Sequence, residues 1–170
     1  MEDKITTITA KMIPQFSDFN DGVYRVVEIL EKEGDRGLTF DEIGWFLQRQ
    51  HKKKGAHKKY GENHTKLSEL LGLIKIDNST PMKSFLTDLG RTFYCADKKE
   101  KESMLREQLL NMAMVQDILK VFNDSFDLKK YLMKYLSEKT AKRRRPNVKR
   151  VFQELSKFED IKIRKIYESL

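Results

Sequence analysis

The chain has 170 residues, of which 39% are hydrophobic and 35% charged, and its formal net charge is +8. This length fits one compact domain or two small ones, and the single cysteine excludes a disulfide framework within the chain. No apolar run approaches the roughly 18 residues of a membrane-spanning helix, and no apolar signal segment follows the first residues, so we expect a cytoplasmic protein without a membrane partner.

Two helices are expected in the first third of the chain. Residues 4–12 alternate only weakly and fit an arm or an edge strand. Over residues 21–33, aliphatic side chains recur at helical spacing and predict the first clear helix. Thr39 and Glu42 then have the spacing of a capping box, which predicts a second helix with Trp45 in the core.

A winged helix-turn-helix is the expected arrangement of residues 39–90. The second helix is followed by a basic segment, 49–66, and by a short helix over 67–71. Two apolar runs, 73–76 and 84–87, are separated by turn-forming residues and predict a two-stranded ribbon. Helix, basic turn, helix and ribbon form the order of a unit that can place one helix in a DNA groove.

Four further helices are expected after the ribbon. The first begins near Asp88, with Cys95 as a small buried residue. A charged connector helix over 98–111 follows, and apolar residues at helical spacing predict helices over 112–122 and 126–136.

The end of the chain faintly repeats its middle. Leu73-Ile-Lys-Ile and Asp160-Ile-Lys-Ile163 each follow a Glu-Leu pair and a basic patch, and each is expected to be a short strand. We therefore predict a mainly α fold with short β ribbons, built as tandem winged helix-turn-helix units. The first unit, residues 1–97, includes an N-terminal arm. The second, residues 98–170, contains the connector helix and lacks an obvious wing. Coincidence is the alternative explanation of so short a repeat.

The positive charge is concentrated in two patches. Residues 49–66 contain seven basic side chains and one acid, Glu62, for a net +6. Residues 139–150 contain seven basic side chains and no acid, for a net +7. An overall +8 leaves −5 for the rest of the chain, so the two patches are the expected contacts for a polyanion. Two solvated basic loops are the alternative.

The first patch is expected to bind duplex DNA together with the helix that follows it. Its lysines are flexible point charges that should hold phosphates, whereas the side chains at the start of the helix should reach base edges. The predicted contacts are Lys52, Lys53, Lys54, Lys58, Lys59, Tyr60, Asn63, His64, Lys66 and Ser68.

The second patch is mostly arginine, which pairs bidentately with guanine. A helix beginning at Pro146 would leave the arginines before it in a turn and would present Asn147 on its surface; a helix kinked at Pro146 is the alternative. The predicted contacts are Lys142, Arg143, Arg144, Arg145, Asn147, Lys149 and Arg150.

Four short motifs carry a resemblance to known proteins. They are Leu73-Ile-Lys75, Phe85-Leu-Thr-Asp-Leu-Gly-Arg91, Leu105-Arg-Glu-Gln-Leu-Leu110 and Thr140-Ala-Lys-Arg-Arg-Arg145. Together they are similar to the tandem winged-helix modules of restriction endonucleases and of AAA-associated bacterial and archaeal proteins, over about Asp21 to Ile163. The resemblance implies a DNA-recognition module, the specificity part of a restriction system, with a nuclease or ATPase subunit as a further partner. Pro146 departs from it, because a helix would be expected to run through that position.

Catalytic and metal-binding patterns are not found. No proline is followed by aspartate, as the metal-binding core of a restriction nuclease would require, and Asp160-Ile-Lys162 supplies only the second half of that pattern. His51, His57 and His64 have no cysteine nearby and, apart from Glu62, no carboxylate. We expect no metal, no cofactor and no enzymatic activity in this chain. The alternatives to duplex DNA binding are a winged-helix protein-interaction adaptor and an RNA binder.

Overall fold

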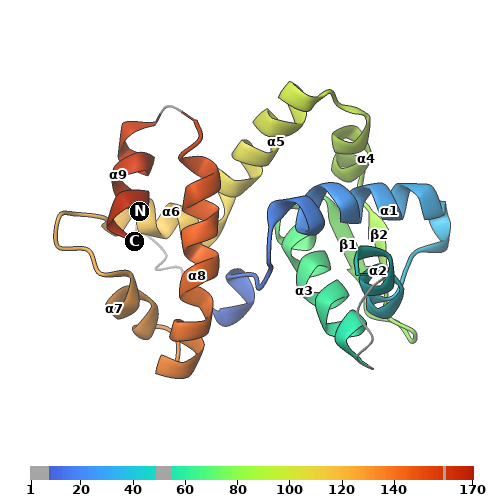
Figure 1. Ribbon diagram of the computed structural model, residues 1–170, viewed down its shortest axis with the longest axis horizontal. Coiled ribbons are helices and arrows are strands. Elements are labelled where there is room, and N and C mark those ends of the chain that lie inside the picture. The colour runs from blue at the N-terminus through green and yellow to red at the C-terminus, as the bar shows by residue number, and fades with distance from the viewer. Residues whose placement is uncertain (1–7, 49–54, 159) are drawn as a thin grey trace, which may run out of the picture. The chain divides into compact units, whose positions relative to one another are not determined.

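The computed structural model describes residues 8–48, 55–158 and 160–170 and is mainly helical (Figure 1). In the described part of the chain there is one sheet, of two antiparallel strands, so the expected mainly α fold with a short β ribbon is confirmed. The chain divides into two compact units. The hairpin unit is Gln15–Leu105; the helical unit is Arg106–Leu170 together with the described residues up to Pro14.

The hairpin unit is built around α1. This helix packs on α2, α3, α4 and β2, and its buried face carries valine and leucine side chains. The elements in chain order are a π-helical turn (Asn20–Arg25), α1 (Val26–Glu33), a 3₁₀ turn (Gly34–Arg36), α2 (Phe40–Leu47), α3 (Ala56–Leu70), β1 (Ile74–Asp77), β2 (Lys83–Leu86), α4 (Asp88–Cys95) and most of α5 (Lys98–Asn111).

The predicted capping box starts α2. The Glu42 backbone N–H donates to Thr39 Oγ1 at 3.3 Å, and the Thr39 N–H donates to Glu42 Oε2 at 2.8 Å. Two N–H groups that the first helical turn would leave unpaired are thereby satisfied. The hydrogen bonds that the Glu42 carboxylate accepts from Thr39 also hold its pKa below the usual value, although partial burial of the carboxylate opposes this effect.

Helices α2 and α3 cross at two glycines. A Cβ added to Gly44 would lie 1.7 Å from the His57 carbonyl oxygen, and one added to Gly61 would lie 1.9 Å from the Phe40 carbonyl oxygen. Both neighbours are backbone atoms, so only glycine allows this approach. The crossing fixes α3 rigidly against α2.

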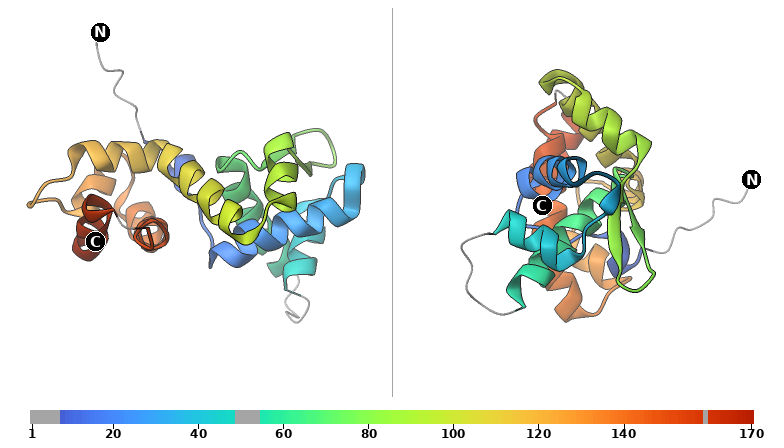
Figure 2. Two further views of the ribbon diagram at one scale, coloured as in Figure 1. Left: turned by 90° about the horizontal axis from the view of Figure 1, so that it is seen from above. Right: turned by 90° about the vertical axis from the view of Figure 1, so that its right-hand side faces the viewer.

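The hairpin pairs Ile74 with Leu86 and Ile76 with Ser84. A further bridge joins Leu38 to Ser84, through N–O distances of 3.1 and 2.8 Å. The segment before α2 is thereby tied to β2. The turn between the strands projects at an edge of this unit (Figure 2).

The helical unit consists of short helices around α8. Its elements are a 3₁₀ turn (Ala10–Met12), the end of α5, α6 (Ala113–Val121), α7 (Leu128–Met133), α8 (Glu138–Leu155) and α9 (Ile161–Ser169). α8 packs on α7 and α9, and Val148, Val151, Phe152 and Leu155 are fully buried on its inner face. None of the described helices of the chain combines the length and the apolar character needed to cross a membrane.

The prediction of a short strand over residues 160–163 is wrong. Asp160 caps α9 by accepting the Ile163 N–H at 3.0 Å, and the described residues of the helical unit contain no strand. Ile163 and Ile166 are buried three residues apart, whereas Ile161 is 78% exposed. This burial follows a helical period and not the alternation of a strand.

Two expected core residues are exposed instead. Trp45 is 50% exposed, because the inner face of α2 is formed by Phe40, Ile43, Gly44 and Leu47 at spacings of three and four. Cys95 is also exposed, since the inner face of α4 is formed by Gly90 and Phe93.

Candidate nucleic-acid interface

The first basic segment is helical over most of its described length. α3 begins at Ala56, eleven residues before the expected start at Leu67. Its buried residues are Gly61, His64, Thr65, Leu67 and Ser68, and those before Leu67 are small or polar, so the first part of the helix shows no apolar pattern. The predicted contacts Lys52, Lys53 and Lys54 lie outside the described residues.

The outer face of α3 carries a mixed polar stripe, which we call the α3 stripe: Lys59, Glu62, Asn63 and Lys66. Glu62 accepts from Lys59 Nζ at 2.8 Å and from Lys66 Nζ at 2.5 Å. These hydrogen bonds hold the pKa of Glu62 below its usual value, and burial opposes them only in part. Within the described residues the Asn63 side chain has no hydrogen-bond partner. Lys58 is exposed beside the stripe.

Three of the predicted contacts on α3 are used inside the fold. Ser68 is fully buried and donates to the Gly22 carbonyl at 2.6 Å. His64 is 1% exposed, and Tyr60 is half-buried. The prediction that His64 and Ser68 reach base edges is therefore wrong, because both lie on the face of α3 that packs on the N-terminal turn of the unit.

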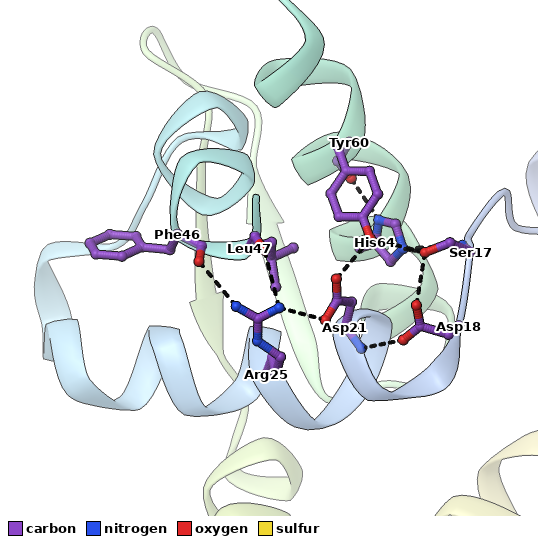
Figure 3. Close-up of polar contacts among 8 residues, drawn as sticks. All are labelled: Ser17, Asp18, Asp21, Arg25, Phe46, Leu47, Tyr60 and His64. Carbon is purple, nitrogen blue, oxygen red and sulfur yellow. Dashed lines mark hydrogen bonds and ion pairs between the residues drawn. The ribbon is translucent and has the colours of Figure 1, made fainter. Parts of the chain in front are cut away.

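His64 and Tyr60 belong to a polar network with Ser17 and Asp21 (Figure 3). The Ser17 N–H donates to His64 Nε2 at 3.1 Å, so this nitrogen is an acceptor and the proton of the neutral ring is on Nδ1. Nδ1 lies 2.8 Å from the Tyr60 carbonyl oxygen, to which it donates. Burial lowers the pKa of His64 and raises that of Tyr60, whose hydroxyl donates to Asp21 Oδ2 at 2.7 Å.

Arg25 extends this network to the end of α2 (Figure 3). It donates to Asp21 Oδ1 at 2.7 Å and to the carbonyls of Phe46 and Leu47 at 3.2 and 3.1 Å. Carbonyls at the end of a helix lack helical partners, and a guanidinium satisfies them well. The network therefore holds α2 and α3 in place. The spacing of Asp21 and Arg25, four residues apart on a helix, is the signal that could have identified the pair.

The second basic patch lies on a continuous helix. α8 runs from Glu138 through Pro146 to Leu155, so the predicted helix start at Pro146 is wrong and the three arginines before it are helical. The sequence signal that could have identified the true start is Ser137, a residue type favoured at helix N-caps. Ser137 accepts the Thr140 N–H at 3.4 Å.

Asn147 is buried and not presented to a partner. Its Nδ2 donates to the Arg143 carbonyl at 3.2 Å, and its Oδ1 accepts from Arg150 at 3.2 Å. Arg145 donates to the Leu170 carbonyl at 3.1 Å. Arg144 is half-buried, and burial, with a smaller effect of Arg143, lowers its pKa. Asn147, Arg144 and Arg150 are therefore less available to base edges than expected, whereas Arg145 is exposed and uses part of its guanidinium for the bond to Leu170.

The remaining side chains of the patch lie on the outer face of α8. Lys139, Lys142, Arg143 and Lys149 are all exposed. No ion pair among the described residues includes any of them. We call these four residues the α8 row.

The described residues contain no group of three histidine, cysteine, aspartate or glutamate side chains that could hold a metal ion. No protein-family model, no curated protein and no solved structure matches the chain.

Proposed function

We propose that this protein binds duplex DNA and that the hairpin unit is a winged helix-turn-helix, with α3 as the helix that enters the major groove. The α3 stripe is the observation that carries the proposal: four hydrogen-bonding side chains of mixed charge lie on the outer face of one rigidly held helix. The resemblance to restriction modules supports a specificity role, beside a nuclease or ATPase subunit.

The order of elements supports this proposal. Three helices are followed by a two-stranded hairpin, and Leu38 bridges to β2 just before α2. In a winged helix, the third helix is the one that reads bases and the hairpin is the wing. The crossing at Gly44 and Gly61 fixes the outer face of α3, as base reading requires.

The chemistry of the α3 stripe suits base edges better than phosphates alone. Asparagine pairs bidentately with adenine N6 and N7, lysine donates to guanine O6 and N7, and glutamate accepts from cytosine N4. Glu62 also orients Lys59 and Lys66, because it is bonded to both. The stripe contains two cations and one anion, so it adds little to non-specific attraction and is suited to discrimination.

Selection from a random duplex pool tests the proposal. The full chain should enrich a common sequence, and Asn63→Ala should relax the preference at one position by about 1–3 kcal/mol. Lys98→Ala is the matched control, since Lys98 is exposed on α5. If no duplex is retained even at low salt, or if the Asn63 variant selects the same sequence equally well, α3 does not read DNA.

A protein-interaction adaptor is the second candidate, because large apolar side chains are exposed on the same unit. Trp45 is 50%, Met82 41% and Leu70 37% exposed. Such exposure of Trp and Met is typical of protein-binding surfaces. If Met82→Ser leaves duplex binding unchanged but abolishes capture by a candidate nuclease or ATPase subunit, the exposed apolar side chains and the α3 stripe serve different partners.

A further inference from the structure

The α8 row differs from the α3 stripe in its charge balance. From Lys139 to Arg150 the helix contains no acidic residue. The two acids of α8 lie near its ends and pair with lysines outside it: Glu138 with Lys129 at 3.4 Å and Glu154 with Lys157 at 2.6 Å. The outer face of α8 is therefore uniformly cationic.

The members of the α8 row share one broad face of the helix. They are spaced three, four and ten residues from Lys139, which places them within an arc of about 120° around the axis. Lys139 and Lys149 are separated by about 15 Å along the axis at 1.5 Å per residue. Duplex DNA has one phosphate per about 3.4 Å of axis on each strand, so this length is comparable to about four phosphates.

The α8 row is supported by the buried inner face and the capped start of its helix. The opposite face of α8 buries Val148, Val151, Phe152 and Leu155 completely, and Ser137 caps its start. Asn147, between the two faces, is bonded to Arg143 and Arg150. The lysines can therefore reach a ligand without a rearrangement of the helix.

We propose that the α8 row is a phosphate-binding surface that holds the backbone of the duplex without reading its sequence; this inference rests on the proposed function of the hairpin unit. Three of its four members are lysines, which act as point charges and do not form the planar fork of a guanidinium. The amide that could have read adenine, that of Asn147, is buried. Phosphate binding of this kind increases the affinity for every sequence alike and makes it depend on salt.

A charge-matched comparison tests this surface. The variant Lys139→Gln, Lys142→Gln, Lys149→Gln removes three charges of the row. The control Lys98→Gln, Lys99→Gln, Lys165→Gln removes three exposed charges elsewhere. Both proteins should keep the thermal midpoint of the wild type. Binding is measured on a selected 20-base-pair DNA duplex, on random-sequence DNA duplexes and on an RNA duplex, at about 50 and about 200 mM salt.

The row variant should lower the slope of log affinity against log salt by about 2 to 3, because each phosphate that a lysine no longer neutralises reduces the slope by about 0.9. The ratio of wild-type affinity to variant affinity should therefore be roughly fortyfold smaller at the higher salt concentration than at the lower one. The order of preference among duplexes should not change. The control should move the slope by clearly less.

Each other outcome overturns the inference. If the row variant and the control behave alike while the wild type still prefers one duplex, α8 does not hold phosphates and the proposed function of α3 stands. If the row variant changes the order of preference, α8 reads bases. If it weakens binding to duplex RNA but not to duplex DNA, the partner is RNA. If the wild type binds no duplex, the inference fails together with the proposed function.

Discussion

Gly61→Ala should strongly destabilise the hairpin unit, although alanine is the better helix former. On propensity alone, the change would stabilise α3 by about 0.5–1 kcal/mol. The new methyl group, however, would lie 1.9 Å from the Phe40 carbonyl oxygen. A comfortable separation is about 3.4 Å, so α2 and α3 would have to move apart by roughly 1.5 Å at their crossing. Overpacking of this kind costs about 1–3 kcal/mol or more, and here the obstacle is backbone on both sides.

We therefore expect a net loss of at least about 2 kcal/mol, which for a unit of this size lowers the thermal midpoint by roughly 8–16 °C. Thermal and urea unfolding of the full chain, followed by circular dichroism, measure this loss. Asn63→Ala is the matched control, because it lies two residues further on the outer face of the same helix. An increase in stability for Gly61→Ala would show that the helices do not cross at this point, and the rigid presentation of the α3 stripe would lose its basis.

Two further substitutions test particular interactions. Burial lowers the pKa of His64 in the folded state below its ordinary 6.5, so the unfolded chain binds more protons at this residue as pH falls. The free energy of unfolding should therefore decrease as pH falls below about 6.5, down to the folded-state pKa. His64→Gln should remove this dependence on pH. A slope between pH 7.5 and 5.5 that persists in the variant would contradict this. Pro146→Ala restores a backbone N–H that can donate to the Lys142 carbonyl inside α8. It should raise the free energy of unfolding of the helical unit by about 1–3 kcal/mol, measured by urea unfolding. A loss of stability would show that the proline fits its position.

The parts of the fold that the sequence predicted well are those with local signals. Thr39 and Glu42 have complementary side chains at the spacing of a capping box, and nothing distant is needed for them to meet. The two strands were identified because turn residues separate two short apolar runs. Asp88–Cys95 and Lys98–Asn111 were likewise found close to their observed bounds.

The remaining features depend on tertiary packing that a sequence pattern does not record. The sequence predicts too short an α3 because the inner face of this helix before Leu67 carries glycine, histidine and threonine in place of an apolar stripe. The burial of His64 and Ser68 follows from partners 47 and 46 residues away, Ser17 and Gly22. Ile161-Lys-Ile163 fits a strand of period two as well as the start of a helix, and only its packing decides between them.

The burial of Asn147 shows the same limit at the candidate site. On a helix that begins at Pro146 this amide would be presented to a partner, whereas on the observed helix it bonds to the Arg143 carbonyl one turn earlier. The sequence identified the two basic patches and their sign. It did not distinguish the mixed α3 stripe from the uniform α8 row, because that difference depends on which side chains face outward.

Amide chemical-shift mapping of the full chain with a selected duplex tests the central claim most directly. The amide signals of α3 between Lys59 and Leu70 should shift in a saturable, salt-sensitive manner. The amide signals of α4, which is expected to make no contact with the duplex, should keep their chemical shifts. Changes confined to the surroundings of Trp45 and Met82, or no changes with any duplex at low salt, would contradict the claim that α3 recognises DNA.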